Sequence, residues 1–472
     1  MEATLEWAKR HTIFLLIGIT FLLYIPSFFG GFMWDDEDFV YSNQYVNNFQ
    51  VDKFFQESAT AGRGKVSNYY RPLQLMTYAI EHKFFGFNPL VFHISNVLWH
   101  IAAGITVYLV MKTIRVPWAL AFGATLIFLL HPIQTEAVSY VSGRSDMMFF
   151  FFILLSFIYS QKKGKRSAIL SLVFFICGLL SKESALLAFA LFPALSFIKY
   201  GFSNEYNSTM RRYIPHFIIG LLYVMFRSSI LEFASTARTW GDNIYITSIS
   251  LRLATFFRNY FFYWQVLLFP YNLHMERDAS TVKIITSFFS AWTWLFLSAQ
   301  ALSVGALFWL YKRSRMYGQI AIGGYVGMHA VMGFYSGLIV LNGIFYEHYL
   351  YSALPFFSLW LGSYIVIMKT PIRTIMLMVI GIWIVVFGVV YNIHRQRDWI
   401  DPIRFFTQTL MYAPNNVRAI NSLGISYAER NDFNKAIETY NKGISLNSSF
   451  PNFYHNIGMA YKGQKRYRKA EE

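Results

Sequence analysis

Cysteine and charged residues are both scarce in this chain of 472 residues. Its single cysteine, Cys177, excludes an intrachain disulfide, and no spacing of cysteine and histidine resembles a zinc site. Charged residues make up only 14% of the sequence, whereas a soluble domain carries about 25%. Hydrophobic residues make up 55%, which excludes a soluble globular protein and indicates a polytopic membrane protein.

Apolar windows long enough to cross the roughly 30 Å of a bilayer core recur through residues 1–394. We therefore expect an all-α bundle of about eleven membrane spans. The first window follows Lys9 and Arg10 and lacks a cleavage pattern, so we interpret it as an uncleaved span rather than a signal peptide. The expected spans are 12–29, 89–111, 116–131, 147–160, 167–181, 184–199, 213–230, 287–311, 318–341, 349–368 and 374–393.

Lysine and arginine cluster in short loops, and the positive-inside rule assigns such loops to the cytoplasmic side. All the clusters fall on that side if the aromatic stretch 251–270 is an interfacial or re-entrant helix. The N-terminus is then cytoplasmic, and the net charge of +16 needs no nucleic acid to explain it. Segments predicted outside the cytoplasm are 30–88, 132–146, 231–286, 342–348 and the chain after residue 394. The basic clusters are Lys9 with Arg10, Lys112 with Arg115, 161–166, Arg211 with Arg212, Lys312, Arg313 and Arg315, and Lys369 with Arg373.

Residues 395–472 have a different composition and repeat themselves at a period of 34, as in Gly424 and Gly458, or Tyr427 and Tyr461. This period and these positions are typical of the tetratricopeptide repeat, a helix-turn-helix unit. Fewer than two repeats are present, and stacking of several repeats normally buries their apolar faces. We therefore expect this region to be truncated or to pack against a partner.

Two polar motifs lie in the first outer segment. The acidic run Asp35 to Asp38 follows the first span, where it could be a solvated flank or could present a carboxylate as a general base. Arg71 precedes Pro72, which suits the first turn of a helix, so this arginine could bind a phosphate or simply extend to the interface.

Further ionisable residues lie between apolar spans, where they are costly and tend to mark sites. The segment 131–146 carries His131, Glu136, Arg144 and Asp146, which could equally fasten helices through an ion pair of Arg144 with Asp146 or Glu136. Lys182 and Glu183 form a polar turn or a cation for a lipid phosphate, and Glu347 and His348 repeat the pattern. His93, Asn96 and His100 share one helix face, where hydrogen bonding between helices is favoured over metal binding because no carboxylate has ligand spacing.

In this order, the motifs resemble the transmembrane and tetratricopeptide-repeat O-mannosyltransferases and, more broadly, the GT-C glycosyltransferases. The resemblance implies a GT-C transmembrane domain over 1–394, with loop 30–88 catalytic, and a repeat region over 395–472. The matching pieces are 32–36, 70–73, Phe92 with His93 and Asn96, His131 with Pro132, 135–138, Gly143 with Arg144, 180–183, 264–270, Glu347 and 349–351.

The resemblance also implies transfer of mannose or another hexose, with inversion, from a polyprenyl-phosphate donor to an acceptor such as protein Ser/Thr hydroxyls. By this analogy Asp35 is the catalytic base and Asp36 its partner, while Arg71, Arg144 and Lys182 are candidates for the donor phosphate. It implies a bacterial inner membrane or endoplasmic reticulum enzyme with no certain cofactor, although a divalent cation could assist. The residues expected in the sugar or acceptor pocket are His93, His131, Glu136, Asp146, Glu183, Glu347, His348 and Tyr351.

The sequence alone is also compatible with two other classes of protein. A lipid or oligosaccharide transporter would also carry polar groups within its spans, although its charges would lie nearer the midplane and its halves would repeat. A membrane-anchored scaffold would use the repeats to recruit protein partners, but it would not need the ordered polar motifs.

Overall fold

The computed structural model describes residues 2–65, 67–230, 245, 248–275, 282–338 and 343–471. Within these ranges the chain forms helices joined by turns, as the predicted all-α class requires. Parts of the predicted outer segments 231–286 and 342–348 lie outside the described residues.

Each window predicted to span the membrane coincides with a helix. Pro89 and its capping residue Asn88, whose side chain accepts from the Leu90 N–H, begin the longest of them, and Ser314 caps the ninth in the same way. The helices are α2 (Thr12–Leu23), α6 (Pro89–Thr113), α7 (Trp118–Leu130), α9 (Arg144–Ser160), α10 (Lys165–Leu179), α11 (Ala188–Tyr200), α13 (Ile214–Ile230), α17 (Ala291–Arg313), α18 (Arg315–Phe334), α19 (Leu354–Ile367) and α20 (Thr370–Trp383), which continues as Ile384–Tyr391 and α21 (Asn392–Asp398).

Not all of these helices reach spanning length. Among the described residues, 5 helical segments are long and apolar enough to cross a membrane, or 6 if the bent pair Trp118–Leu130 and Pro132–Val138 is one span. Helices α2 and α19 are apolar but shorter. The chain is therefore helical and rich in apolar helices, while the count of about eleven spans stays a prediction.

Glycine residues allow a close contact between helices α18 and α19 of the bundle. A Cβ placed on Gly324 of α18 would lie 2.7 Å from the Phe356 carbonyl oxygen and the Trp360 nitrogen of α19. Gly327 meets the Phe356 ring in the same way. Glycine at these positions lets the two backbones approach, which is how helices associate where lipid removes the hydrophobic driving force.

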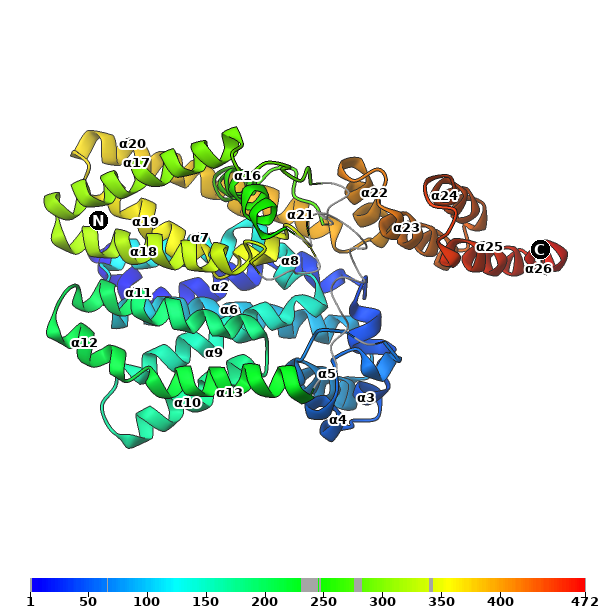
Figure 1. Cartoon of the computed structure of the whole chain (residues 1–472), viewed down its shortest axis with the longest axis horizontal. Coiled ribbons are helices and arrows are strands. Elements are labelled where there is room, and N and C mark those ends of the chain that lie inside the picture. The colour runs from blue at the N-terminus through cyan, green and yellow to red at the C-terminus, as the bar shows by residue number, and fades with distance from the viewer. Residues whose placement is uncertain are drawn as a thin grey trace.

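The two ends of the bundle differ. Figure 1 shows the turns joining α9 to α10, α17 to α18 and α19 to α20 at the left end, together with the N-terminal helix α1 (Glu2–Arg10). Helix α1 and these turns carry four of the predicted basic clusters: Lys9 with Arg10, 161–166, Lys312 with Arg313 and Arg315, and Lys369 with Arg373. The loop after α2, the short helix α8 (Thr135–Val138), α21 and the repeats lie at the right end (Figure 1), so the predicted outer segments converge on one end.

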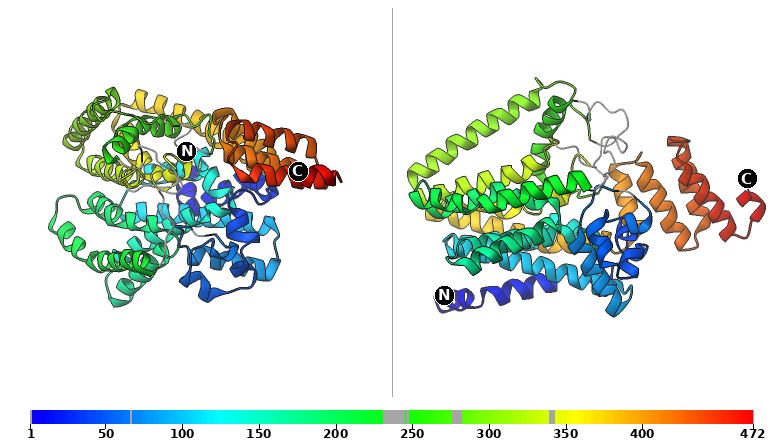
Figure 2. Two further views of the ribbon diagram at one scale, coloured as in Figure 1. Left: turned by 45° about the vertical axis from the view of Figure 1, so that its right-hand side comes forward. Right: turned by 60° about the horizontal axis from the view of Figure 1, so that its bottom comes forward.

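Helix α16 (Ile249–Leu268) covers the aromatic stretch predicted to lie at the interface. In the right-hand view of Figure 2 it runs across the direction of the bundle helices, near the end that carries the repeats. This is the orientation expected of a helix at a membrane surface.

The loop after α2 is a small helical unit with its own core. It contains α3 (Gln44–Asn47), α4 (Val51–Gln56) and α5 (Pro72–Phe85). Phe54 of α4 and Tyr78 of α5 pack with Phe39, which lies in the preceding short helical segment Glu37–Tyr41. Pro72 is the first residue of α5, as expected from its fixed φ.

The C-terminal region projects from the same end as a series of paired helices (Figure 2). The first repeat places Gly424 against the Tyr440 ring, where a Cβ would lie 2.2 Å from that ring. The helices of the C-terminal region are α22 (Pro402–Tyr412), α23 (Val417–Glu429), α24 (Phe433–Leu446), α25 (Pro451–Gly463) and α26 (Tyr467–Glu471). At the opposite end of the bundle, α12 (Asn204–Arg211) completes the fold.

Candidate active site

The acidic run after α2 separates into residues with different environments. Trp34 adopts a positive φ of 54°, which turns the chain just before the two aspartates. Asp36 is fully buried: one carboxylate oxygen accepts from the Met33 N–H at 3.0 Å, and the other from the Ser142 N–H at 2.8 Å and the Ser142 hydroxyl at 2.5 Å. Burial outweighs these hydrogen bonds and raises the pKa of Asp36 to about 7.

Asp35 is only half-buried, and its backbone N–H donates to the Tyr140 hydroxyl at 3.1 Å. The next two acids are surface residues, since Glu37 pairs with Arg63 at 2.9 Å and Asp38 with Lys65 at 2.7 Å. The solvated-flank interpretation therefore fits Glu37 and Asp38, while Asp36 anchors the loop and Asp35 sits beside that anchor.

Arg71 and Lys182 lie close together because the start of α5 is joined to the end of α10. The Leu73 N–H donates to the Leu180 carbonyl at 3.1 Å, which brings Arg71 within electrostatic range of Lys182 and Glu183. Lys182 is buried and pairs with both oxygens of Asp146, at 2.7 and 2.8 Å.

Arg227 of α13 adds a third cation near Glu183, and its guanidinium donates to the Asn68 carbonyl. The cluster thus contains three cations, Arg71, Lys182 and Arg227, and two carboxylates, Asp146 and Glu183.

Arg71 is the cation of this cluster for which the described residues provide aromatic contacts but no hydrogen bond. It is 9% exposed, its guanidinium lies over the Tyr69 ring at 4.5 Å, and its Nε is buried with no hydrogen-bond partner in the described part of the chain. A buried guanidinium is costly when unpaired, so its donors are suited to an anionic ligand.

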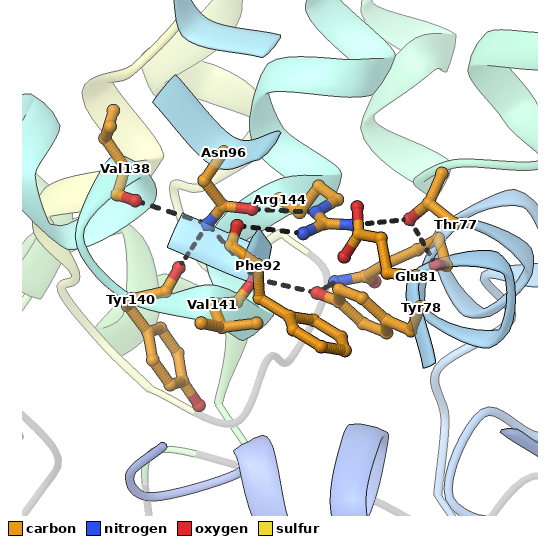
Figure 3. Close-up of polar contacts among 10 residues, drawn as sticks. Thr77, Tyr78, Glu81, Phe92, Asn96, Val138, Tyr140, Val141 and Arg144 are labelled. Atoms are coloured by element: carbon orange, nitrogen blue, oxygen red, sulfur yellow. Dashed lines mark hydrogen bonds and ion pairs between the residues drawn. The ribbon is translucent and has the colours of Figure 1, made fainter. Parts of the chain in front are cut away.

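Arg144 belongs to a different network (Figure 3). It is fully buried and joins α9 to α5 and α6: Nε donates to Asn96 at 2.7 Å, one terminal nitrogen to Glu81 at 2.7 Å and Thr77 at 2.8 Å, and the other to the Phe92 carbonyl at 3.1 Å. The predicted pairs of Arg144 with Asp146 or Glu136 do not form, because Asp146 holds Lys182 and Glu136 holds His348. The structure does not bring Arg144 together with Arg71 and Lys182.

Glu136, Glu347 and His348 do lie together, as the resemblance implies. One oxygen of Glu136 accepts from the backbone N–H groups of Glu347 at 2.9 Å and His348 at 3.3 Å, and the other lies 2.6 Å from His348 Nδ1. The Glu347 carboxylate is fully buried, with Arg395 at 3.5 Å, and Arg395 also donates to Asp398 at 3.3 Å.

A series of aromatic contacts connects these polar groups. Tyr346 packs beside Met33 and Tyr140 near the Asp35 loop, and its ring lies 5.3 Å from that of Tyr349. Tyr349 stacks on Tyr335 at 4.0 Å, whose hydroxyl lies 2.8 Å from Ser184, two residues after Lys182. The Asp35 loop, the Glu136 group and the Arg71 cluster therefore form one continuous region.

His131, His93 and Tyr351 are engaged inside the bundle. His131 accepts from the Ile133 N–H at 3.1 Å and donates to the Leu267 carbonyl at 3.1 Å, so backbone groups occupy both ring nitrogens. Tyr351 bonds His100 at 2.9 Å, and His93 lies 3.4 Å from the Gly31 carbonyl. These contacts agree with hydrogen bonding between helices, and His93 additionally supports the loop that carries Asp35.

The chain after α21 packs directly on the Asp35 loop. The Trp34 ring lies 5.5 Å from that of Phe406 in α22, and Met33 and Tyr140 share an apolar cluster with Trp399. Contacts between the repeat region and the candidate site are thus direct.

Within the described ranges, no three His, Cys, Asp or Glu side chains are grouped to hold a metal ion. Assistance by a divalent cation stays a prediction.

Four side chains of the site were missed from the sequence: Tyr140, Ser142, Arg227 and Arg395. Arg227 is the only Asp, Glu, Lys or Arg in α13. Arg395 follows the last predicted span on the side predicted to lie outside the cytoplasm, where the positive-inside rule disfavours arginine. Both residues could therefore have been identified as candidates from the sequence. Tyr140 and Ser142 carry no such signal, since their role depends on contacts with the distant Asp35 loop.

Comparisons with known proteins find related chains. A tetratricopeptide-repeat model matches residues 424–465. The protein O-mannosyl-transferase TMTC3 of Mus musculus is 22% identical over 100% of this chain and 55% of its own length. The protein O-mannosyl-transferase F38B6.6 of Caenorhabditis elegans is 24% identical over 59% of this chain and 40% of its own length.

The chain therefore spans about half the length of the curated relatives it matches. Among solved structures, the chain is similar to ArnT from Cupriavidus metallidurans bound to undecaprenyl phosphate. The superposition covers 96% of this chain and 78% of the ArnT chain, at 13% sequence identity and a TM-score of 0.42. At this TM-score the two helix arrangements agree only loosely. The resemblance indicated by the ordered motifs is confirmed by the sequence comparisons: the chain is similar, over its whole length, to protein O-mannosyl-transferases of the TMTC type.

Proposed function

We propose that the protein is a GT-C glycosyltransferase that moves mannose or another hexose from a polyprenyl-phosphate donor to protein Ser/Thr hydroxyls outside the cytoplasm. The contrast between two buried arginines carries this proposal. Arg144 is hydrogen-bonded through all three nitrogens, whereas the Arg71 guanidinium, which lies beside Lys182, has a buried Nε without a hydrogen-bond partner in the described part of the chain. The names of the related chains support the same activity.

The charge of the Arg71 cluster suits the donor. A sugar linked through a phosphodiester carries one negative charge, and the buried guanidinium of Arg71 offers hydrogen-bond donors to such a phosphate. When the glycosidic bond breaks, the phosphate becomes a monoester and gains further negative charge. Arg71, supported by Lys182, meets that charge where it develops.

In the proposed step, an acceptor hydroxyl attacks the anomeric carbon and gives its proton to the Asp35 carboxylate. The electron pair of the breaking bond leaves with the polyprenyl phosphate. A single displacement inverts the anomeric carbon and needs no covalent sugar-enzyme intermediate.

The contacts of the other predicted site residues assign them to different roles. Asp36 acts as a positioning residue, since its carboxylate ties the Asp35 loop to Ser142. Glu136, Glu347 and His348 border the sugar or acceptor side of the region. Asp146 and Glu183, predicted for the same pocket, instead belong to the Arg71 cluster. Arg144, His131 and Tyr351 hold helices together, so we no longer assign Arg144 to the phosphate.

The test uses the full chain reconstituted with a polyprenyl-phosphate mannose and a Ser/Thr-rich peptide. Asp35→Asn is expected to lower transfer by about 10²–10⁴-fold, the usual contribution of a general base. Glu37→Gln removes a neighbouring surface carboxylate, of which 43% is exposed, and serves as the matched control with unchanged transfer.

Arg71→Gln should raise the apparent KM for the donor while the KM for the peptide is unchanged. Full activity of Asp35→Asn would contradict the assigned base. Movement of the intact lipid-linked sugar across the bilayer, without transfer to peptide, would instead favour the transporter hypothesis.

A further inference from the structure

A basic cavity lies at the end of the bundle opposite the candidate active site. Its volume is about 380 Å³, and it is enclosed by the turn between α9 and α10 and by the start of α13. Figure 1 shows these segments at the left end of the bundle. The candidate active site uses the other ends of the same helices, because Lys182 follows α10 and Arg227 ends α13.

The cavity is positively charged with no built-in counter-ion. Lys162, Lys163 and Arg212 line it, and none of its lining residues is acidic. Helix α10 adds Lys165 and Arg166 in its first turn, where it has neither an acidic residue nor a side-chain cap. Cations at a helix N-terminus oppose the macrodipole, so this arrangement favours a bound anion.

None of these five cations forms an ion pair with a carboxylate in the described part of the chain. Lys162 lies over the Tyr159 ring at 4.4 Å, and Arg212 makes one long contact of 3.5 Å with the Ser160 carbonyl. Their charged groups are therefore available to a ligand.

The inner wall of the cavity is rigid and polar. His216 is 3% exposed, and its Nε2 lies 2.9 Å from the hydroxyl of Ser171, which is itself bonded to Ser156. The other ring nitrogen, Nδ1, is buried near the Arg212 carbonyl without a hydrogen bond of normal geometry. The rings of Phe175 and Phe192 hold the imidazole in place.

Apolar surface continues from the cavity along two helices that pack together. Leu172 and Pro215 line the cavity itself. Beyond them, large apolar side chains at helical spacing are exposed on α10 and α13: Ile169, Val173 and Ile176 on the first, and Ile214, Phe217 and Leu221 on the second. A ligand with a charged head and a long apolar tail fits this combination.

We propose that this cavity binds a phosphate group, carried by a membrane lipid whose tail lies along α10 and α13. The cations neutralise the phosphate, and the apolar faces favour a lipid over a free phosphate as its source. This proposal does not depend on the proposed function, because it uses none of the residues assigned to transfer.

The test measures binding to the full chain purified in detergent, by native mass spectrometry. The probes are phosphatidic acid, phosphatidylcholine and inorganic phosphate. The variant Lys163→Gln with Arg212→Gln removes two cavity cations, and Lys312→Gln with Arg313→Gln removes two exposed cations from the same end of the bundle as a control.

We expect the wild type and the control to bind phosphatidic acid, and the cavity variant to bind it about tenfold more weakly, which corresponds to about 1.4 kcal/mol. Phosphatidylcholine should bind all forms equally weakly. Equal loss in the control and the cavity variant, or no loss in either, would overturn the site. Displacement of phosphatidic acid by inorganic phosphate at equal concentration would overturn the lipid as the source of the phosphate.

Discussion

Replacing Arg144 by methionine tests whether this residue stabilises the fold or binds the lipid-linked sugar donor. The substitution removes an ion pair of 2.7 Å to Glu81 and leaves that carboxylate, which is 9% exposed, without its cation. Breaking a buried pair by removing one partner costs about 3–5 kcal/mol. We therefore expect Arg144→Met to lose about 3–5 kcal/mol of unfolding free energy in the absence of any donor.

The measurement is unfolding of the purified chain by sodium dodecyl sulfate, followed by circular dichroism, in a double-mutant cycle with Glu81→Gln. The double variant should recover about 2 kcal/mol relative to Arg144→Met, because the acceptors that remain unpaired on Asn96, Thr77 and Phe92 are neutral and cost less than a charge. A loss below about 1 kcal/mol, or no recovery in the double variant, would refute the structural role. So would a loss that appears only when donor is present.

Two further predictions concern the Asp35 loop. Burial raises the pKa of Asp36 from 3.8 to about 7, so its contribution to stability is complete below about pH 4 and is lost progressively as pH rises to about 7. The melting temperature of the wild type should therefore fall between about pH 4 and 7 relative to that of Asp36→Asn, and parallel curves would contradict the raised pKa. Phe406→Ala removes the ring 5.5 Å from Trp34 and should lower kcat for transfer with little change in the donor KM. Met411→Ala, 66% exposed on the same helix, should change neither value. An unaltered kcat in Phe406→Ala would show that α22 does not support the loop.

The helices themselves could be predicted because they depend on composition along short windows. Pro72 marked the start of α5, and the period of 34 marked the repeats that begin with α23 and α24. The span count could not be settled in this way. Several apolar helices are shorter than a bilayer requires, and their ends turn into short helical segments such as Pro132–Val138.

The pairing of charges could not be predicted, because it depends on contacts between distant segments. Arg144 and Asp146 are two residues apart on one helix, so their side chains point to different faces and cannot pair. Each instead meets a residue from another segment, Glu81 or Lys182. The separation of Asp35 from Asp36 depends likewise on Ser142, which lies 106 residues further along the chain.

The left-handed turn at Trp34 has a consequence for how the loop can vary. It places adjacent aspartates in opposite surroundings, one anchored under the loop and the other beside Tyr140. Insertion or deletion of a single residue between Gly31 and Trp34 would shift both carboxylates by one position and remove Asp36 from its contacts with Met33 and Ser142. The length of the loop is therefore under tighter constraint than most of its side chains, and homologous loops should accept substitutions far more readily than changes in length.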